Sequence, residues 1–80
     1  MYSSAKVKNM LWENYRKDDG SLSLQVAFSE LYAGESANWL AVGLNYILQI
    51  EALSPIKSRQ IAATIIIQAA ELANRKYPNE

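Results

Sequence analysis

The chain has 80 residues, a formal net charge of zero at pH 7, no cysteine and no histidine. This composition limits it to one small domain, residues 1–80, and excludes disulfides, metal sites with thiolate or imidazole ligands, and Ser-His-Asp or Cys-His catalysis. A chain with no net positive charge also lacks a general electrostatic attraction to nucleic acids or anionic lipids.

The first predicted helix begins at Ser3 or Ser4, either of which can cap it, and runs to about Lys17. The residues KDDG then end it, because aspartates favour turns and Gly20 can adopt a positive φ without steric cost. The opening residues MYSSAKVKNM lack the apolar run of a signal peptide. We therefore expect a cytoplasmic protein with no membrane span.

The next segment, SLSLQVAFSELYAG, fits two kinds of secondary structure. Its apolar residues alternate as in a strand over 22–28, but they also follow helical spacing over 24–32. No second strand is available to pair with it, and an isolated strand leaves its backbone groups unmatched. We therefore expect a helix, capped by Ser21 or Ser23 and ended at Gly34.

Two longer helices are predicted over residues 36–52 and 55–76. Ser36 caps the first, and Ser54 caps the second, with Pro55 in the first helical position where its missing N–H costs nothing. A connection of two or three residues forces an antiparallel hairpin. The predicted fold is all-α, a small bundle of three to four helices dominated by this hairpin.

Both hairpin helices have more apolar surface than one core face requires. In the last helix the polar positions form one narrow row: Lys57, Gln60, Thr64, Gln68, Glu71 and Arg75. The preceding helix has a similarly thin row of Asn38, Asn45 and Gln49, with Ala41 between them. We expect a second copy to cover the excess, giving a homodimer. The predicted self-association residues are Ile61, Ile65, Ile66 and Leu72. The alternative is a monomer with a fully wrapped last helix.

We expect a non-enzymatic protein–protein interaction module, with no catalytic, cofactor or metal site. Regulatory adaptors, inhibitors of larger proteins and accessory proteins of phages or plasmids all fit this description, and the residues do not choose among them. Binding energy at protein interfaces concentrates in aromatic and arginine side chains. The candidate contacts for a protein partner are therefore Trp12, Tyr15, Trp39 and Tyr46. For Trp39 and Tyr46, a place in the core is an equal alternative.

The alternative function is a DNA-binding transcriptional regulator. The residues SPIKSRQ place Lys57, Arg59 and Gln60 at a helix N-terminus, where a recognition helix carries its base-reading side chains. Against this, the net charge is zero and residues 21–53 contain no lysine or arginine. Ordinary solvent exposure of a first helical turn also explains these side chains.

The residues WLAVGLNY resemble the opening helix of a tetratricopeptide repeat, since Trp39, Val42, Gly43 and Tyr46 have its spacing. The resemblance implies that two helices lie close together at the glycine. It covers one helix only: Pro55 and Arg59 stand where the repeat has small and aromatic residues, and one copy is present where about three are needed. The pattern therefore predicts a glycine-mediated helix contact.

Overall fold

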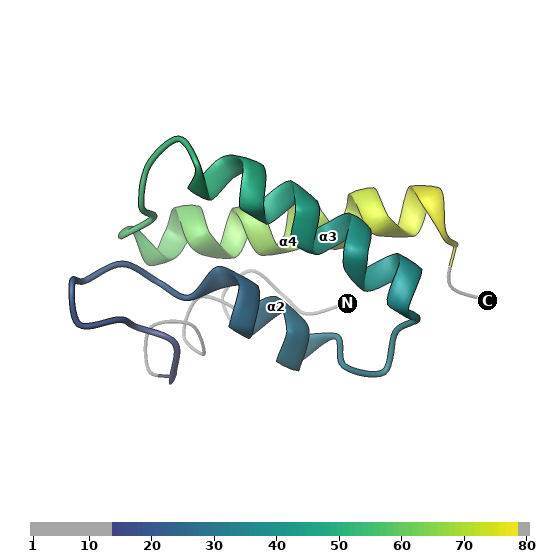
Figure 1. Ribbon diagram of the computed structural model, residues 1–80, viewed down its shortest axis with the longest axis horizontal. Coiled ribbons are helices and arrows are strands. Elements are labelled where there is room, and N and C mark those ends of the chain that lie inside the picture. Colours follow the sequence, from purple (N-terminus) through teal and green to yellow (C-terminus); the bar gives the residue numbers. More distant parts are fainter. Residues whose placement is uncertain (1–13, 79–80) are drawn as a thin grey trace.

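The computed structural model describes residues 14–78. Within this range the chain forms three α-helices and, apart from one isolated bridge, no β-structure (Figure 1). The helices are α2 (Leu24–Leu31), α3 (Ala37–Glu51) and α4 (Arg59–Lys76). The predicted all-α class is confirmed. The predicted first helix falls mainly on residues 1–13, which lie outside the described range.

Residues 15–23 form a closed loop that replaces the end of the predicted first helix. The prediction that this helix continues to Lys17 is wrong, because Arg16 pairs with Leu22 in an antiparallel bridge and is therefore extended. Gly20 has a φ of 86°, as expected for the residue that lets the chain turn back.

The segment that fits either a strand or a helix is helical, as predicted. α2 buries one face, made of Leu24, Ala27 and Phe28 at helical spacing. Ser23 occupies the N-cap position, but its side chain makes no capping hydrogen bond. The helix ends before Gly34, which has no positive φ.

The start of α3 matches its prediction, whereas the start of α4 does not. Ser36 Oγ accepts a hydrogen bond from Trp39 N–H at 3.2 Å. α4 begins at Arg59 instead of Pro55, and its capping residue is Ser58. The reason is a long-range hydrogen bond: the Ile56 carbonyl accepts from Leu22 N–H at 2.8 Å, which ties residues 52–58 to the loop before α2.

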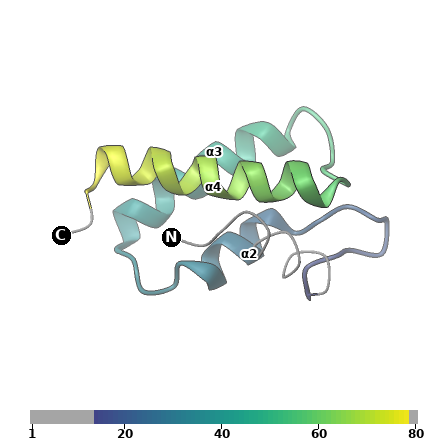
Figure 2. The same ribbon diagram turned by 180° about the vertical axis from the view of Figure 1, so that it is seen from behind.

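α3 and α4 still form the predicted antiparallel hairpin, and two side-chain hydrogen bonds set its register. Trp39 Nε1–H donates to Asn74 Oδ1 at 2.8 Å. Nearer the connection, Tyr46 O–H donates to Gln68 Oε1 at 2.9 Å. α2 packs on one side of this pair (Figures 1 and 2).

The core lies between α2 and the hairpin. The Phe28 ring stacks on Trp39, with centroids 5.5 Å apart and planes 10° apart, and Tyr32 packs against both rings. A Cβ on Gly43 would overlap Cζ and Cε2 of Phe28, so α3 reaches α2 at this residue only because it lacks a side chain. The predicted glycine-mediated helix contact is confirmed.

Candidate functional site

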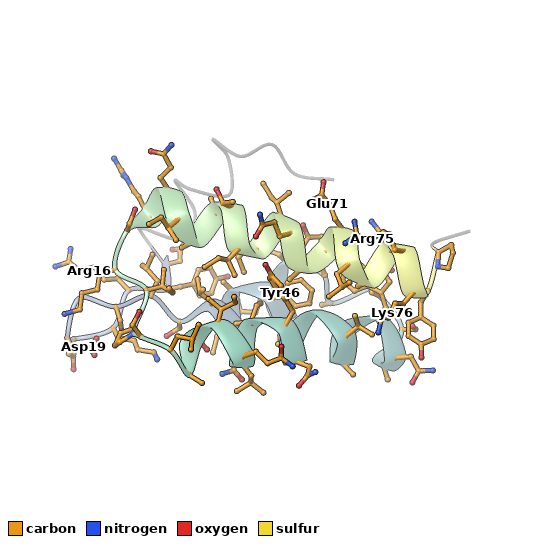
Figure 3. All side chains as sticks on the ribbon, turned by 90° about the horizontal axis from the view of Figure 1, so that it is seen from above. Arg16, Asp19, Tyr46, Glu71, Arg75 and Lys76 are labelled. Atoms are coloured by element: carbon orange, nitrogen blue, oxygen red, sulfur yellow. The ribbon has the colours of Figure 1, made fainter. Side chains whose placement is uncertain are left out.

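The face of the hairpin directed away from α2 carries a groove between α3 and α4 (Figure 3). Its volume is about 560 Å³. We call it the outer groove, and it is lined by Asn38, Ala41, Val42, Asn45, Tyr46, Gln49, Leu72, Lys76 and Tyr77. Most of the lining comes from α3, on a different side of that helix from the buried Trp39, Gly43 and Ile47.

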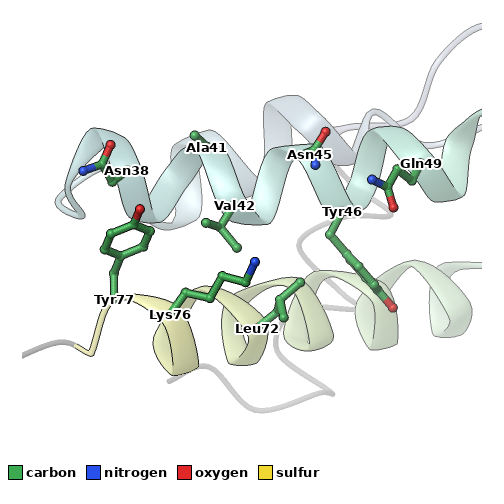
Figure 4. A pocket seen from close by; sticks show the side chains of 9 residues that line it. All are labelled: Asn38, Ala41, Val42, Asn45, Tyr46, Gln49, Leu72, Lys76 and Tyr77. Carbon is green, nitrogen blue, oxygen red and sulfur yellow. The ribbon is translucent and has the colours of Figure 1, made fainter.

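Helical spacing on α3 places three primary amides, Asn38, Asn45 and Gln49, along the rim of the outer groove. Ala41, between them, is too short to fill the space. In Figure 4 the Lys76 side chain extends along the groove between Val42 and Leu72. The thin polar row of the sequence therefore forms one wall of a concave site.

A second hollow of about 510 Å³ lies along the first half of α4. We call it the α4 hollow, and its lining is Ser58, Gln60, Ile61, Thr64, Ile65 and Gln68. Gln68 accepts the hydrogen bond from Tyr46, which lines the outer groove, so the two depressions are neighbours with this pair between them. Residues 61, 65, 68 and 72 also share one face of α4 by their spacing.

The side chains that line the two depressions are almost all uncharged. Lys76 is the one charged side chain among the residues that line them, and no carboxylate is included. The remaining polar groups are amides and hydroxyls, which donate and accept hydrogen bonds without shifting protons at neutral pH.

The structure separates the four predicted self-association residues. Ile66 is fully buried and Ile65 is 6% exposed, so Ile66 belongs to the core and is not part of any surface. Ile61 is 54% exposed and lines the α4 hollow, while Leu72 is half-buried in the outer groove. The physical reason is the position of the core, since residues 62, 66, 69 and 73 form the centre of the buried face of α4.

The residues predicted to contact a protein partner do not form one surface. Trp39 is 2% exposed and hydrogen-bonded within the hairpin, so it is a core residue. Tyr46 lines the outer groove. Tyr15 lies apart from the groove, and its O–H donates to Glu30 Oε2 at 2.8 Å; this hydrogen bond, with burial and the Glu30 charge, raises the pKa of Tyr15. Trp12 lies outside the described residues.

The three residues of the DNA-binding alternative are exposed, but they do not share one helical turn. Arg59 and Gln60 are in the first turn of α4, whereas Lys57 precedes the cap residue. Asp19 lies close enough to Lys57 for that positive charge to help lower its carboxyl pKa, after the stronger effect of hydrogen bonds from Ser21. The cationic group predicted at the helix start is therefore broken up and partly balanced by an acid.

Sequence reasoning missed Lys76 and Tyr77 as site residues. They stand at the end of α4 and line the outer groove opposite the start of α3, so their importance depends on the register between the helices. One feature of the sequence does indicate this part of the groove. The three amides Asn38, Asn45 and Gln49 interrupt a largely apolar helix at helical spacing and so mark the side of α3 that forms the groove.

No protein-family model, curated protein or solved structure matches this chain. Within residues 14–78, no helix is long and apolar enough to cross a bilayer. The same part of the chain has no group of three acidic, histidine or cysteine side chains placed to hold a metal ion. A proposal for function therefore has to rest on the outer groove and the α4 hollow.

Proposed function

We propose that this chain is a small, non-enzymatic protein–protein interaction module, such as an adaptor or an inhibitor of a larger protein. It binds its partner in the outer groove and pairs with a second copy through the end of the hairpin at the α3–α4 connection. The observation that carries the proposal is the open face of the hairpin: α2 covers one side, and the other has two neighbouring depressions lined by aliphatic, amide, hydroxyl and tyrosine side chains and by Lys76.

Self-association is supported by exposed aliphatic side chains at one end of the hairpin. Leu53 is 83% exposed in the α3–α4 connection, Ile61 is 54% exposed in the first turn of α4, and Leu48 is 50% exposed near the end of α3. The register that joins Tyr46 to Gln68 places positions 53 and 61 at the same level of the hairpin. Because three side chains supply only part of the roughly 600 Å² per partner found in small interfaces, we expect a weak dimer, dissociating at micromolar concentrations.

Sedimentation equilibrium of the full chain over a range of micromolar concentrations tests the dimer. The mass should rise from 9.0 kDa toward twice that value, and Ile61→Glu should abolish the rise because it places a charge in the apolar contact. Val26→Glu is the matched control, since Val26 is exposed to a similar extent, at 50%, but lies on α2. A mass of 9.0 kDa at all concentrations, or equal effects of the two variants, would exclude this dimer.

The DNA-binding alternative gains no support from the hairpin, because Lys57 lies outside α4 and beside Asp19. It stays a prediction from the sequence, as does the cytoplasmic location.

A further inference from the structure

We infer that the ligand of the outer groove is an extended segment of a partner protein that carries a carboxylate group, which Lys76 binds. This inference rests on the proposed function and specifies the chemistry of the partner. It follows from three features of the groove: its single charge, the spacing of its amides and the nature of its floor.

The charge of the groove favours an anionic group in the ligand. Lys76 forms no ion pair with a carboxylate of residues 14–78, and its side chain points along the groove (Figure 4). Glu35 lines an adjoining hollow that includes Lys76 and Tyr77, so it limits the positive potential at that end without entering the outer groove. A partner carboxylate placed over Val42 and Leu72 would meet a cation and no lining acid.

The amides favour a peptide backbone in extended form. A primary amide has two N–H donors and a carbonyl acceptor, which matches the donor and acceptor of a peptide group. At 1.5 Å per residue, positions 45 and 49 of α3 are about 6 Å apart and positions 38 and 49 about 16 Å apart. Extended chains repeat every second residue at about 6.6 Å, so the groove matches roughly five residues of such a segment.

The floor favours an extended segment over a helix. A helical ligand binds through a row of large apolar anchors and therefore needs a continuous apolar groove. Here the apolar floor is short, consisting of Ala41, Val42, Leu72 and the Tyr46 ring, and the rim is polar. The short floor leaves the amides of the rim for the backbone of the ligand.

The test is selection of random 12-residue peptides displayed on phage, using the immobilised full-length protein as bait. Selected peptides should be enriched in aspartate and glutamate. The variant Lys76→Glu should instead enrich lysine and arginine, because it reverses the charge of the groove. Selection of the same acidic peptides by wild type and Lys76→Glu would overturn the inference.

Quantitative binding of the best acidic peptide, followed by fluorescence anisotropy, supplies the matched controls. Lys76→Ala should weaken binding about tenfold, the size expected for one charge-assisted hydrogen bond. Arg75→Ala should change it less than twofold, because Arg75 is the neighbouring cation but lines neither depression. Equal losses in the two variants would mean nonspecific attraction and would contradict the inference.

Failure of the inference can be told apart from failure of the proposed function. Ala41 is exposed and lines the groove, so Ala41→Arg fills the groove without disturbing the core. If the selected peptides are neutral but lose binding to Ala41→Arg, the groove binds proteins and only the acidic chemistry is wrong. If no selected peptide is affected by Ala41→Arg, the groove is not a peptide-binding site and both proposals fail.

Discussion

Two small residues of α3, Ala41 and Gly43, lie only two positions apart and face opposite surroundings. The Phe28 ring of α2 occupies the space that a side chain on Gly43 would need. Ala41 lines the outer groove, where no described element fills the space above it. A small residue in a helix therefore either admits a neighbouring ring or leaves a depression, and the outcome depends on what another helix places opposite it.

Gly43→Ala should disrupt the contact between α3 and the Phe28 ring, and it should lower the free energy of unfolding more than the other changes proposed below. The new methyl group overlaps the buried Phe28 ring so closely that the cost should lie at or above the upper end of the about 1–3 kcal/mol usual for overpacking. The higher helix propensity of alanine recovers only about 1 kcal/mol, which leaves a net loss of about 2 kcal/mol or more. Urea unfolding should show a net loss of stability. Gly34→Ala is the control, because nothing lies within 4 Å of its added Cβ and its φ is not positive.

A double-mutant cycle identifies the cause of that loss. Phe28→Leu should destabilise the wild type but recover part of the stability in the Gly43→Ala background, because a smaller side chain makes room for the methyl group. If the two changes are simply additive, the steric explanation is wrong.

The two hydrogen bonds between α3 and α4 also differ in their surroundings, since one is partly buried on the core side and the other is exposed on the groove side. Asn74→Ala leaves the indole N–H of the buried Trp39 without its acceptor and should cost about 1–2 kcal/mol in urea unfolding. Gln68→Ala is the matched change at the exposed Tyr46–Gln68 bond, where water can replace the acceptor. It should cost less than about 0.5 kcal/mol. Equal losses would mean that the groove side is as tightly packed as the core side.

The smallest effect is expected in the loop before α2, where an exposed acid is held by a buried hydroxyl. Ser21 Oγ–H and N–H both donate to Asp19 Oδ1, at 2.6 and 2.9 Å, and lower the pKa of Asp19 below its ordinary value of 3.8. The lowered value favours the folded state above about pH 4, and this contribution is lost as the pH falls through the pKa of the folded protein.

Carboxyl NMR titration should place the Asp19 midpoint below its ordinary value, and Ser21→Ala should move it up. Asp19→Asn serves as the control, because it removes the titrating group and with it this part of the acid dependence. An unchanged midpoint in Ser21→Ala would mean that the hydroxyl does not hold the carboxylate.

The sequence predicted features that depend on neighbouring residues and failed where distant residues compete. Ser36 caps α3 as predicted, because the cap and the N–H that it accepts from are three residues apart. Pro55 is an equally good local start signal, yet the chain there is not helical, because the Ile56 carbonyl binds Leu22 N–H. No pattern within residues 53–60 contains that hydrogen bond.

The candidate site was predictable to a similar extent. Tyr46 was a candidate because aromatic side chains concentrate binding energy, and Ile61 and Leu72 because the last helix has more apolar surface than one core face requires; all three line a depression. Ile66 was assigned to the surface wrongly, since the direction of the core around α4 depends on where α2 and α3 pack. Lys76 could not be paired with the amide row without the register of the hairpin.

The Gly43–Phe28 contact has a consequence for how this sequence can vary over evolution. Any descendant with a side chain at position 43 must reduce the volume at position 28 or move α2 away from α3, whereas position 41 carries no such constraint. Positions 28 and 43 should therefore covary in size across relatives of this chain, and a glycine paired with an aromatic ring fifteen residues earlier is a pattern by which such relatives can be recognised.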